Sequence, residues 1–407
     1  MKRKFRYITE AKNTHMEHIE DLIFNKGVDG ARQAINFIRD IRDTLSGHST
    51  KKQNITVKWD GAPAIFVGVD PEDDKYFVAK KGLFAKTPKM YKSKADMKDL
   101  SGDLKKKFVI AFDEFKKLGI KKGVYQGDLM FIKSDLKLEK LDDTGVKYVT
   151  FQPNTIVYAV PTKTPLASKV MKAKIGVVWH TTYSGKTIKD MSASFGKGIA
   201  KKFKQSPSIW MDDATYRDVT GQATLTSKET AELTEILSAA GKVFQKLSAS
   251  VLNSIHQDED LMIKIKTFNN TFVRAGEPFP NPRDHVRKLY DWIQAKYQKE
   301  IDDRKTDKAK DKQREILKRV NKIFANPREL ENIFVLMNHL VNAKTIVINK
   351  LNQASGLGTF LRTRNGFKAT NQEGFVAIDN IKGSIKLVDR MEFSRANFSP
   401  EVIKGWS

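Results

Sequence analysis

A lysine, Lys58, stands at the end of an apolar segment, directly before a turn of Asp, Gly and Pro residues: Val57-Lys58-Trp59-Asp60-Gly61-Ala62-Pro63. Lysine is seldom placed at the end of a buried strand. Burial and nearby cations lower the pKa of an amine, so a lysine in such a place can be nucleophilic near neutral pH. The spacing Lys-x-Asp-Gly is a weak signal by itself in a chain this rich in lysine. Other motifs along the chain must therefore decide whether Lys58 is a nucleophile.

Other short segments carry charged residues within or beside apolar runs. Asp128 and Glu373 offer carboxylate oxygens, which Mg²⁺ takes as ligands beside phosphate oxygens and water. Lys386, with Lys80 or Lys81, could screen the charge on a phosphate group in a transition state. Singly, each is better explained as a turn acid, a strand-end acid or a surface lysine.

In this order along the chain, the segments resemble the motifs of ATP-dependent DNA and RNA ligases and mRNA capping enzymes. The segment Lys58-Trp-Asp-Gly is similar to motif I, with Lys58 at the position of the nucleophile. Lys80-Lys81-Gly82 is similar to the segment in which a basic residue before glycine supports a phosphate or the incoming 5′-phosphate end. Gly127-Asp128 resembles motif III, with Asp128 in place of the usual glutamate.

Three later segments extend the resemblance. Tyr158, in Thr155-Ile-Val-Tyr158, stands where motif IIIa has the aromatic residue that stacks on the purine. Glu373-Gly-Phe-Val matches motif IV, and Ile385-Lys386-Leu-Val is similar to motif V, whose lysines bind the α-phosphate. The resemblance implies ATP and Mg²⁺ as cofactors. It implies catalytic residues Lys58, Asp60 and Lys386; cofactor-binding residues Lys58, Gly61, Lys80, Lys81, Asp128, Tyr158, Glu373 and Lys386; and metal ligands Asp128 and Glu373.

The chain departs from the family pattern in several places. Thr56 stands where ligases often have an acid, and Val388 replaces the second lysine of motif V. Only 21 residues follow Lys386, too few for the C-terminal OB-fold of DNA ligases and capping enzymes, which favours an RNA-ligase-like enzyme. The interval of 245 residues between Asp128 and Glu373 is long for the family. We expect that an inserted helical segment replaces the missing domain as the nucleic-acid clamp.

Residue patterning predicts an α+β fold around a mixed, mainly antiparallel nucleotidyltransferase domain. Apolar spacing predicts an N-terminal helix near 30–45 and another near 104–118, and short β-rich runs predict strands between 55 and 183 and between 373 and 389. Start signals predict at least three later helices. They are the capping box Thr226-Ser-Lys-Glu229 and the pairs Asn281-Pro282 and Asn326-Pro327, each of which places a capping side chain before a first-turn proline. The expected domains are 1–185 (N-terminal helices and first part of the adenylation domain), 186–353 (inserted helical subdomain) and 354–407 (last strands).

The composition indicates a polyanionic partner. The 73 Lys and Arg against 48 Asp and Glu give a net charge of +25, which attracts nucleic acid, although a solvated lysine-rich surface is the simpler explanation of charge alone. Lys197, Lys201, Lys202 and Lys204 are expected to let the helical segment bind the polynucleotide. No apolar run approaches membrane-spanning length, and the absence of cysteine fits a reducing compartment, so the expected location is cytoplasmic. The resemblance to phage-encoded enzymes implies that this is the cytoplasm of an infected bacterial host.

The expected function is ATP-dependent joining of RNA, or of DNA or mixed strands. Lys58 takes AMP from ATP and releases pyrophosphate, AMP passes to a 5′-phosphate end, and a 3′-hydroxyl then displaces AMP. The resemblance is closest to a phage-encoded RNA ligase. Two alternatives remain: a nucleotidyltransferase that uses GTP or another acceptor, and a non-catalytic nucleic-acid-binding or phage structural protein on a ligase-like scaffold.

Overall fold

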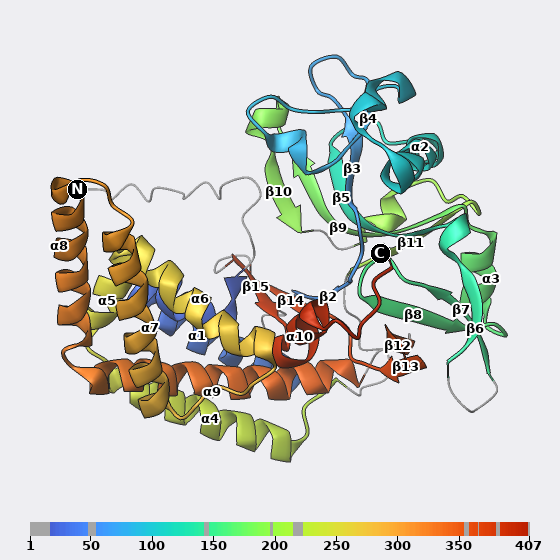
Figure 1. Ribbon diagram of the computed structural model, residues 1–407. Coiled ribbons are helices and arrows are strands. Elements are labelled where there is room, and N and C mark those ends of the chain that lie inside the picture. Colours follow the sequence, from blue (N-terminus) through green and yellow to red (C-terminus); the bar gives the residue numbers. More distant parts are fainter. Residues whose placement is uncertain are drawn as a thin grey trace, which may run out of the picture.

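The computed structural model describes residues 17–47, 54–141, 146–195, 198–214, 223–353, 358–364, 366–379 and 383–405 (Figure 1). The helices are α1 (Leu22–Leu45), α2 (Gly102–Phe115), α3 (Pro165–Lys172), α4 (Ser227–Lys246), α5 (Ala249–Gln257), α6 (Glu259–Ala275), α7 (Pro282–Asp302), α8 (Asp307–Phe324), α9 (Pro327–Asn352) and α10 (Arg395–Phe398). The strands are β1 (Glu17–His18), β2 (Asn54–Lys58), β3 (Ala64–Val69), β4 (Tyr76–Ala79), β5 (Val124–Ile132), β6 (Lys137–Lys140), β7 (Lys147–Phe151), β8 (Ile156–Pro161), β9 (Ile175–Ser184), β10 (Ser192–Phe195), β11 (Ile209–Asp213), β12 (Gly358–Thr363), β13 (Gly366–Ala369), β14 (Gly374–Asp379) and β15 (Gly383–Leu387).

The strands form three sheets in which most neighbours are antiparallel. A four-stranded sheet has the order β1-β15-β14-β2, and a five-stranded sheet has the order β13-β12-β8-β7-β6. The six-stranded sheet has the order β10-β9-β5-β3-β4, with β11 added in parallel beside β9. The expectation of a mixed α+β fold with mainly antiparallel sheets is therefore confirmed.

Local signals in the sequence explain where several helices begin. The backbone N–H of Glu229 donates to the side chain of Thr226, and the N–H of Thr226 donates back to Glu229, which is the expected capping box of α4. Asn281 likewise accepts from the N–H of Asp284 at the start of α7. Helix α9 begins at Pro327, as expected, but the Asn326 side chain makes no capping hydrogen bond. Among the described residues, no helix has the length and apolar character needed to cross a bilayer.

The helical segment starts later than the sequence suggested. A helical texture was expected from residue 186, but β10 and β11 both pair with β9, and the first helix of the segment, α4, begins at Ser227. Such short strands have a weak local preference, and pairing with an available strand decides their structure. Lys201, Lys202 and Lys204 consequently lie beside β11 in the sheet region, and Lys197 is outside the described residues.

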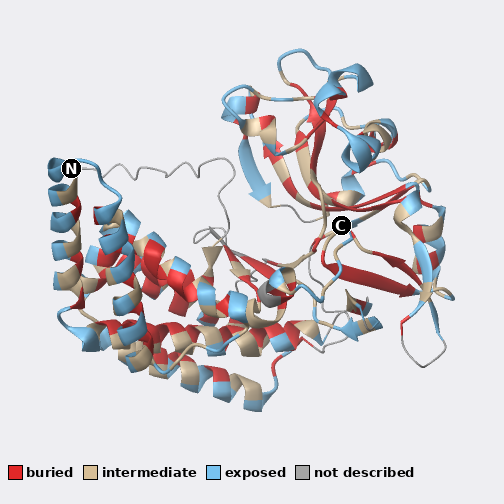
Figure 2. Cartoon of the chain, viewed as in Figure 1, coloured by how far each residue is buried: buried red, intermediate tan, exposed pale blue. Residues whose placement is uncertain are grey.

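Helix α1 and the helices α4 to α9 share one hydrophobic core with the four-stranded sheet. The buried residues of that core run from Ile23 and Ile38 of α1, through Leu340 of α9, to Phe375 and Ile385 of the sheet. In Figure 2 the buried positions of these helices face inward and the exposed ones face outward. The N-terminal helix thus packs with the helical segment and the four-stranded sheet rather than with the six-stranded sheet, and the helical segment does not form a separate core.

A buried ion network joins the helical segment to both ends of the described chain. Lys344 of α9 donates to Glu20, in the short helix Ile19–Asp21, at 2.7 Å, and both side chains are at most 3% exposed. Arg390 donates two hydrogen bonds to Asp21, at 2.8 and 3.2 Å. Burial alone would raise the pKa of Glu20, but the charges of Lys344 and Arg390 outweigh it and lower that pKa to about 2.

We predict that Lys344→Met destabilises the protein by about 3–5 kcal/mol, because Glu20 would lose its closest buried countercharge. The measurement is the free energy of unfolding in urea. The double variant Glu20→Gln/Lys344→Met should recover most of this loss, since it removes both charges together. A single variant as stable as the native protein would contradict the account.

The lowered pKa of Glu20 also predicts a dependence of stability on pH. Because the folded-state value lies below the ordinary value of 4.5, the stabilisation is fully present above pH 4.5 and is lost as the pH falls toward about 2. The double variant Glu20→Gln/Lys344→Met lacks this carboxylate, so its stability should fall less steeply over the same range. This prediction would be wrong if the free energies of unfolding of the two proteins decreased by the same amount between about pH 5 and pH 3.

Candidate active site

Lys58 and Glu373 meet at neighbouring strands of the four-stranded sheet. Lys58 ends β2 and lies opposite Gly374, the first residue of β14, and its Nζ forms an ion pair with a carboxylate oxygen of Glu373. The side chains are 24% and 12% exposed, so the pair is shielded but reachable. Gly374 has a φ of 150°, and a Cβ there would lie 2.5 Å from the Leu387 carbonyl oxygen, so glycine is required directly after Glu373.

Asp60 is buried and holds the chain after Lys58 in place. Its carboxylate accepts hydrogen bonds from the Asn154 side chain at 2.7 Å and from the backbone N–H groups of Thr155 and Ile156 at 2.7 and 2.8 Å. Burial raises the pKa of Asp60, while these hydrogen bonds and the charge of Lys58 act in the opposite direction. Its oxygens are thus engaged by the β7–β8 connection, which makes Asp60 a positioning residue.

Tyr158 lies in the core, in contrast to the exposed stacking position that the family resemblance implied. It is 1% exposed, and its hydroxyl accepts a hydrogen bond of 2.8 Å from the backbone N–H of Asp60. Its ring packs against Trp59 and Phe151, with centroid distances of 5.2 and 5.5 Å. Tyr158 supports the Lys58 turn from behind, and its ring faces are covered by protein.

Asp128 approaches the Lys58 turn from the six-stranded sheet. A Cβ on Gly61 would lie 2.4 Å from the Cβ of Asp128, so only glycine permits this approach, and the N–H of Ala62 donates to the Leu129 carbonyl at 3.0 Å. The nearest cationic candidate to Asp128 is His180 of β9, whose Nε2 lies 3.7 Å from its carboxylate. His180 was not an expected site residue. Its place in the sequence, directly after the apolar run 175–179, was a signal that could have indicated it.

Lys386 occupies β15, next to the strand that follows Glu373. It lies opposite Val376 of β14 and, on its other side, opposite His18 of β1. Burial lowers the pKa of Lys386, the charge of Lys58 lowers it further, and Glu373 opposes both. The structure therefore brings together two lysines, Lys58 and Lys386, around the carboxylate of Glu373.

Lys80 and Lys81 follow β4, two strands away from Asp128 in the six-stranded sheet. Lys80 forms an ion pair of 2.9 Å with Asp99, which also pairs with Lys89. Lys81 is exposed. Both lie toward the same end of the sheet as Asp128, but no described contact joins them to Lys58 or Glu373.

Glu373 is the most perturbed carboxyl of the site. Burial raises its pKa to about 7 against the opposing charge of Lys58, and Asp60 and Asp128 add to the rise. Within the described ranges no cluster of three or more His, Asp or Glu side chains could hold a metal ion. Asp128 and Glu373 would thus supply only two carboxylates, which suits a Mg²⁺ ion bound mainly through substrate phosphates and water.

Comparison with protein families identifies one match, over residues 13–402, to DUF6267, a family of unknown function. The match covers most of the chain, so the chain belongs to that family. Neither the curated proteins nor the solved structures gave a match.

The geometry predicts that two aspartates of this site differ in their effect on stability. Asp60→Asn should destabilise the protein by about 1–3 kcal/mol, because an amide cannot accept all three hydrogen bonds that the carboxylate accepts. Asp128→Asn is the matched control and should change stability by less than about 0.5 kcal/mol, since Asp128 is partly exposed and accepts no such set of bonds. Urea unfolding of both variants measures this, and equal losses would contradict the assigned roles.

Proposed function

We propose that this protein is an ATP-dependent polynucleotide ligase that acts through a covalent lysyl-AMP intermediate on Lys58. The observation that carries the proposal is the partly buried pair of Lys58 and Glu373, flanked by Lys386 and Asp128. These residues come from distant parts of the sequence. A lysine, two carboxylates and a second lysine in one site suit nucleophilic attack on a phosphate better than they suit a structural role.

In the first step the chain's own groups can act as follows. The proton of the Lys58 ammonium passes to Glu373, whose carboxylate is its ion-pair partner and whose raised pKa makes it a suitable acceptor. The freed amine attacks the α-phosphorus of ATP, a P–N bond forms, and the bond to the pyrophosphate oxygen breaks. Lys386 screens the negative charge of the α-phosphate.

The later steps follow from the phosphoramidate. The AMP group passes from Lys58 to a 5′-phosphate end, and a 3′-hydroxyl then displaces AMP to form the new phosphodiester bond. Mg²⁺, held by Asp128 and Glu373 together with phosphate oxygens, would neutralise phosphate charge in these steps. RNA is the proposed substrate, with DNA or mixed strands as the alternatives to compare.

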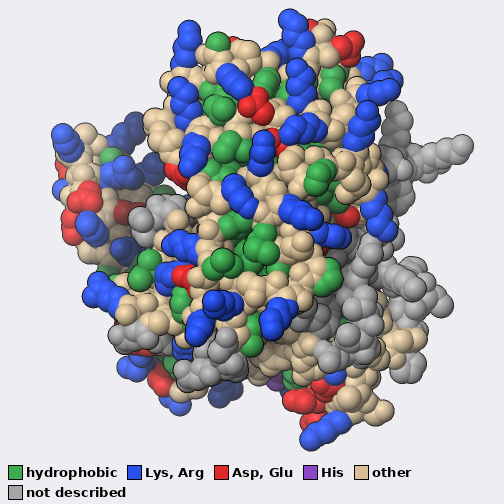
Figure 3. Space-filling view, turned by 90° about the vertical axis from the view of Figure 1, so that its right-hand side faces the viewer, with side chains coloured by type: hydrophobic (Ala, Val, Ile, Leu, Met, Phe, Trp, Pro, Cys, Tyr) green, Lys and Arg blue, Asp and Glu red, His purple; other side chains and the backbone are tan. Residues whose placement is uncertain are grey.

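Electrostatics of the sheet region support a polyanionic substrate. Between residues 144 and 189 the sequence has seven lysines and no Asp or Glu. Lys163, Lys169, Lys172 and Lys174, in and around α3, are exposed. Figure 3 shows Lys and Arg side chains spread over this side of the molecule, with few acidic ones among them. Such a surface attracts a phosphate backbone with a strength that falls as salt rises.

We predict that Lys58→Ala abolishes transfer of label from [α-³²P]ATP to the protein and all ATP-dependent sealing, because Lys58 is the amine that forms the ion pair with Glu373, its proposed proton acceptor. Lys94→Ala, which removes the same charge from a lysine paired with Asp113, is the control and should still be labelled. Persistent labelling of the Lys58 variant would refute the assignment.

Two further arms separate the rival functions. Asp128→Asn should slow labelling by about a hundredfold in a single-turnover assay, the scale of one lost electrostatic stabiliser. Labelling from [α-³²P]GTP rather than ATP would point to the other nucleotidyltransferase class. Nucleic-acid binding without any labelling by the native protein would indicate a non-catalytic binding protein.

A further inference from the structure

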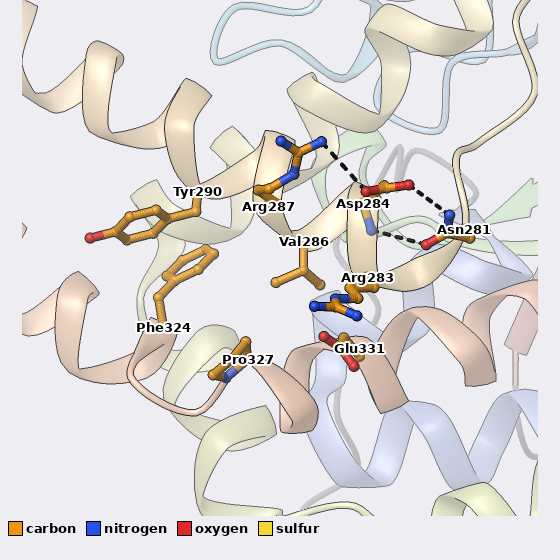
Figure 4. A pocket seen from close by; sticks show the side chains of 9 residues that line it. All are labelled: Asn281, Arg283, Asp284, Val286, Arg287, Tyr290, Phe324, Pro327 and Glu331. Atoms are coloured by element: carbon orange, nitrogen blue, oxygen red, sulfur yellow. Dashed lines mark hydrogen bonds and ion pairs between the residues drawn. The ribbon is translucent and has the colours of Figure 1, made fainter.

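A cavity of about 670 Å³ opens between α7, the end of α8 and the start of α9. None of its lining residues belongs to the strands that carry Lys58, Glu373 or Lys386. Its apolar wall is made by Val286 and Tyr290 of α7, Phe324 of α8 and Pro327 of α9 (Figure 4). Tyr290 and Phe324 pack together with ring centroids 5.3 Å apart. The cavity therefore offers a planar guest an aromatic and aliphatic surface.

Two arginines stand at the edge of the cavity. Arg283 makes no hydrogen bond or ion pair with any other described residue, and Arg287 has only a long contact of 3.5 Å with Asp284. Both are exposed, so neither guanidinium is neutralised by a close partner. A planar guanidinium binds phosphate oxygens through two donors at once. The edge is thus equipped for a phosphate beside the apolar wall.

Acidic groups at the edge narrow the choice of guest. Glu331 lines the cavity from α9, facing the Arg283 side in Figure 4, and Asp284 lies next to Arg287. A purely anionic guest, such as free phosphate, would be repelled by these carboxylates. A guest that joins a phosphate to a planar ring with N–H donors satisfies all three kinds of group, and a nucleotide has this chemistry.

We propose that this cavity holds one nucleotide of a single-stranded part of the polynucleotide substrate, with its base on the wall of Tyr290 and its phosphate at Arg283 and Arg287. This rests on the proposed function, because it assigns to the helical segment a grip on the same substrate.

Charge along the neighbouring helices favours a strand over a free nucleotide. Helix α8 has seven Lys and Arg against three Asp and Glu. Several of these cations are exposed along α8, namely Lys308, Lys312, Arg314, Lys318, Arg319 and Lys322. They extend the positive field beyond the reach of a mononucleotide.

The test measures binding of fluorescein-labelled 20-nucleotide U and dT strands by anisotropy, over a series of salt concentrations, with the full-length protein. Tyr290→Leu keeps an apolar side chain beside Phe324 and removes the aromatic face; it should weaken binding about tenfold without changing the salt dependence. Arg283→Ala should weaken binding and lower the slope of log K against log salt by about one. Arg304→Ala, an exposed arginine beyond the far end of α7, is the matched control for charge.

A strand with abasic sites supplies the second arm. If the base lies on Tyr290, the effects of Tyr290→Leu and of abasic substitution should not add, since each removes the same contact. Native affinity in both Tyr290→Leu and Arg283→Ala, or equal losses in Arg304→Ala, would overturn the proposal. Displacement of the strand from the native protein by millimolar AMP would also overturn the proposal, because the cavity would then bind a free nucleotide.

Lys58 labelling in the same variants separates this proposal from the proposed function. Tyr290→Leu and Arg283→Ala should both still be labelled by ATP at the native rate, since neither residue belongs to the Lys58 site. If the variants are labelled and bind the strand as the native protein does, the cavity proposal is wrong and the ligase proposal stands. If the native protein is never labelled but the two variants lose strand binding, the ligase proposal is wrong and the cavity still binds a strand.

Discussion

The ion pair between Lys58 and Glu373 is the interaction on which the candidate site depends. It places a cation and an anion in a poorly solvated position, where each is stable mainly because the other is present. Three neighbouring residues keep this pair in place. Gly374 permits the close contact of β14 with Leu387 directly after Glu373, and Gly61 permits the approach of Asp128. The hydrogen bonds of Asp60 hold the turn that follows Lys58. With its pKa raised to about 7, Glu373 can exchange a proton with its partner near neutral pH.

The helical segment is coupled to this site through a shared core and a buried ion network. Phe375 and Ile385, from the strands on either side of the site, pack in the same core as α1 and α9. Lys344 reaches from α9 to Glu20, just after the strand β1 that pairs with β15 and lies opposite Lys386. A displacement of α9 would therefore shift β1 and, through its pairing, the strand β15 that carries Lys386. This arrangement gives the helical segment a physical connection to the candidate site.

The sequence was informative where local chemistry decides structure and less so where distant contacts decide it. The capping residues Thr226 and Asn281 act as predicted, because a cap involves only neighbours along the chain. The motif order led to Lys58, Glu373 and Lys386, which the pairing of β2, β14 and β15 brings together, and to Asp128, which approaches Gly61 from β5 of the other sheet. Sequence alone did not reveal that Tyr158 is buried, that α1 joins the helical core, or that β10 and β11 extend the six-stranded sheet, because each outcome is set by tertiary packing. His180 was missed for the same reason, since only the pairing of β5 with β9 places it beside Asp128.

The most direct measurement is peptide mass spectrometry of the native protein after incubation with ATP and Mg²⁺. A lysyl phosphoramidate is preserved at neutral or alkaline pH, so digestion and separation under those conditions can locate it. We expect one AMP per chain, carried on the peptide that contains Lys58, and its loss when a 5′-phosphorylated strand is added. An AMP on any other residue, or a protein that gains no mass from any nucleoside triphosphate, would show that Lys58 is not the nucleophile of a ligase.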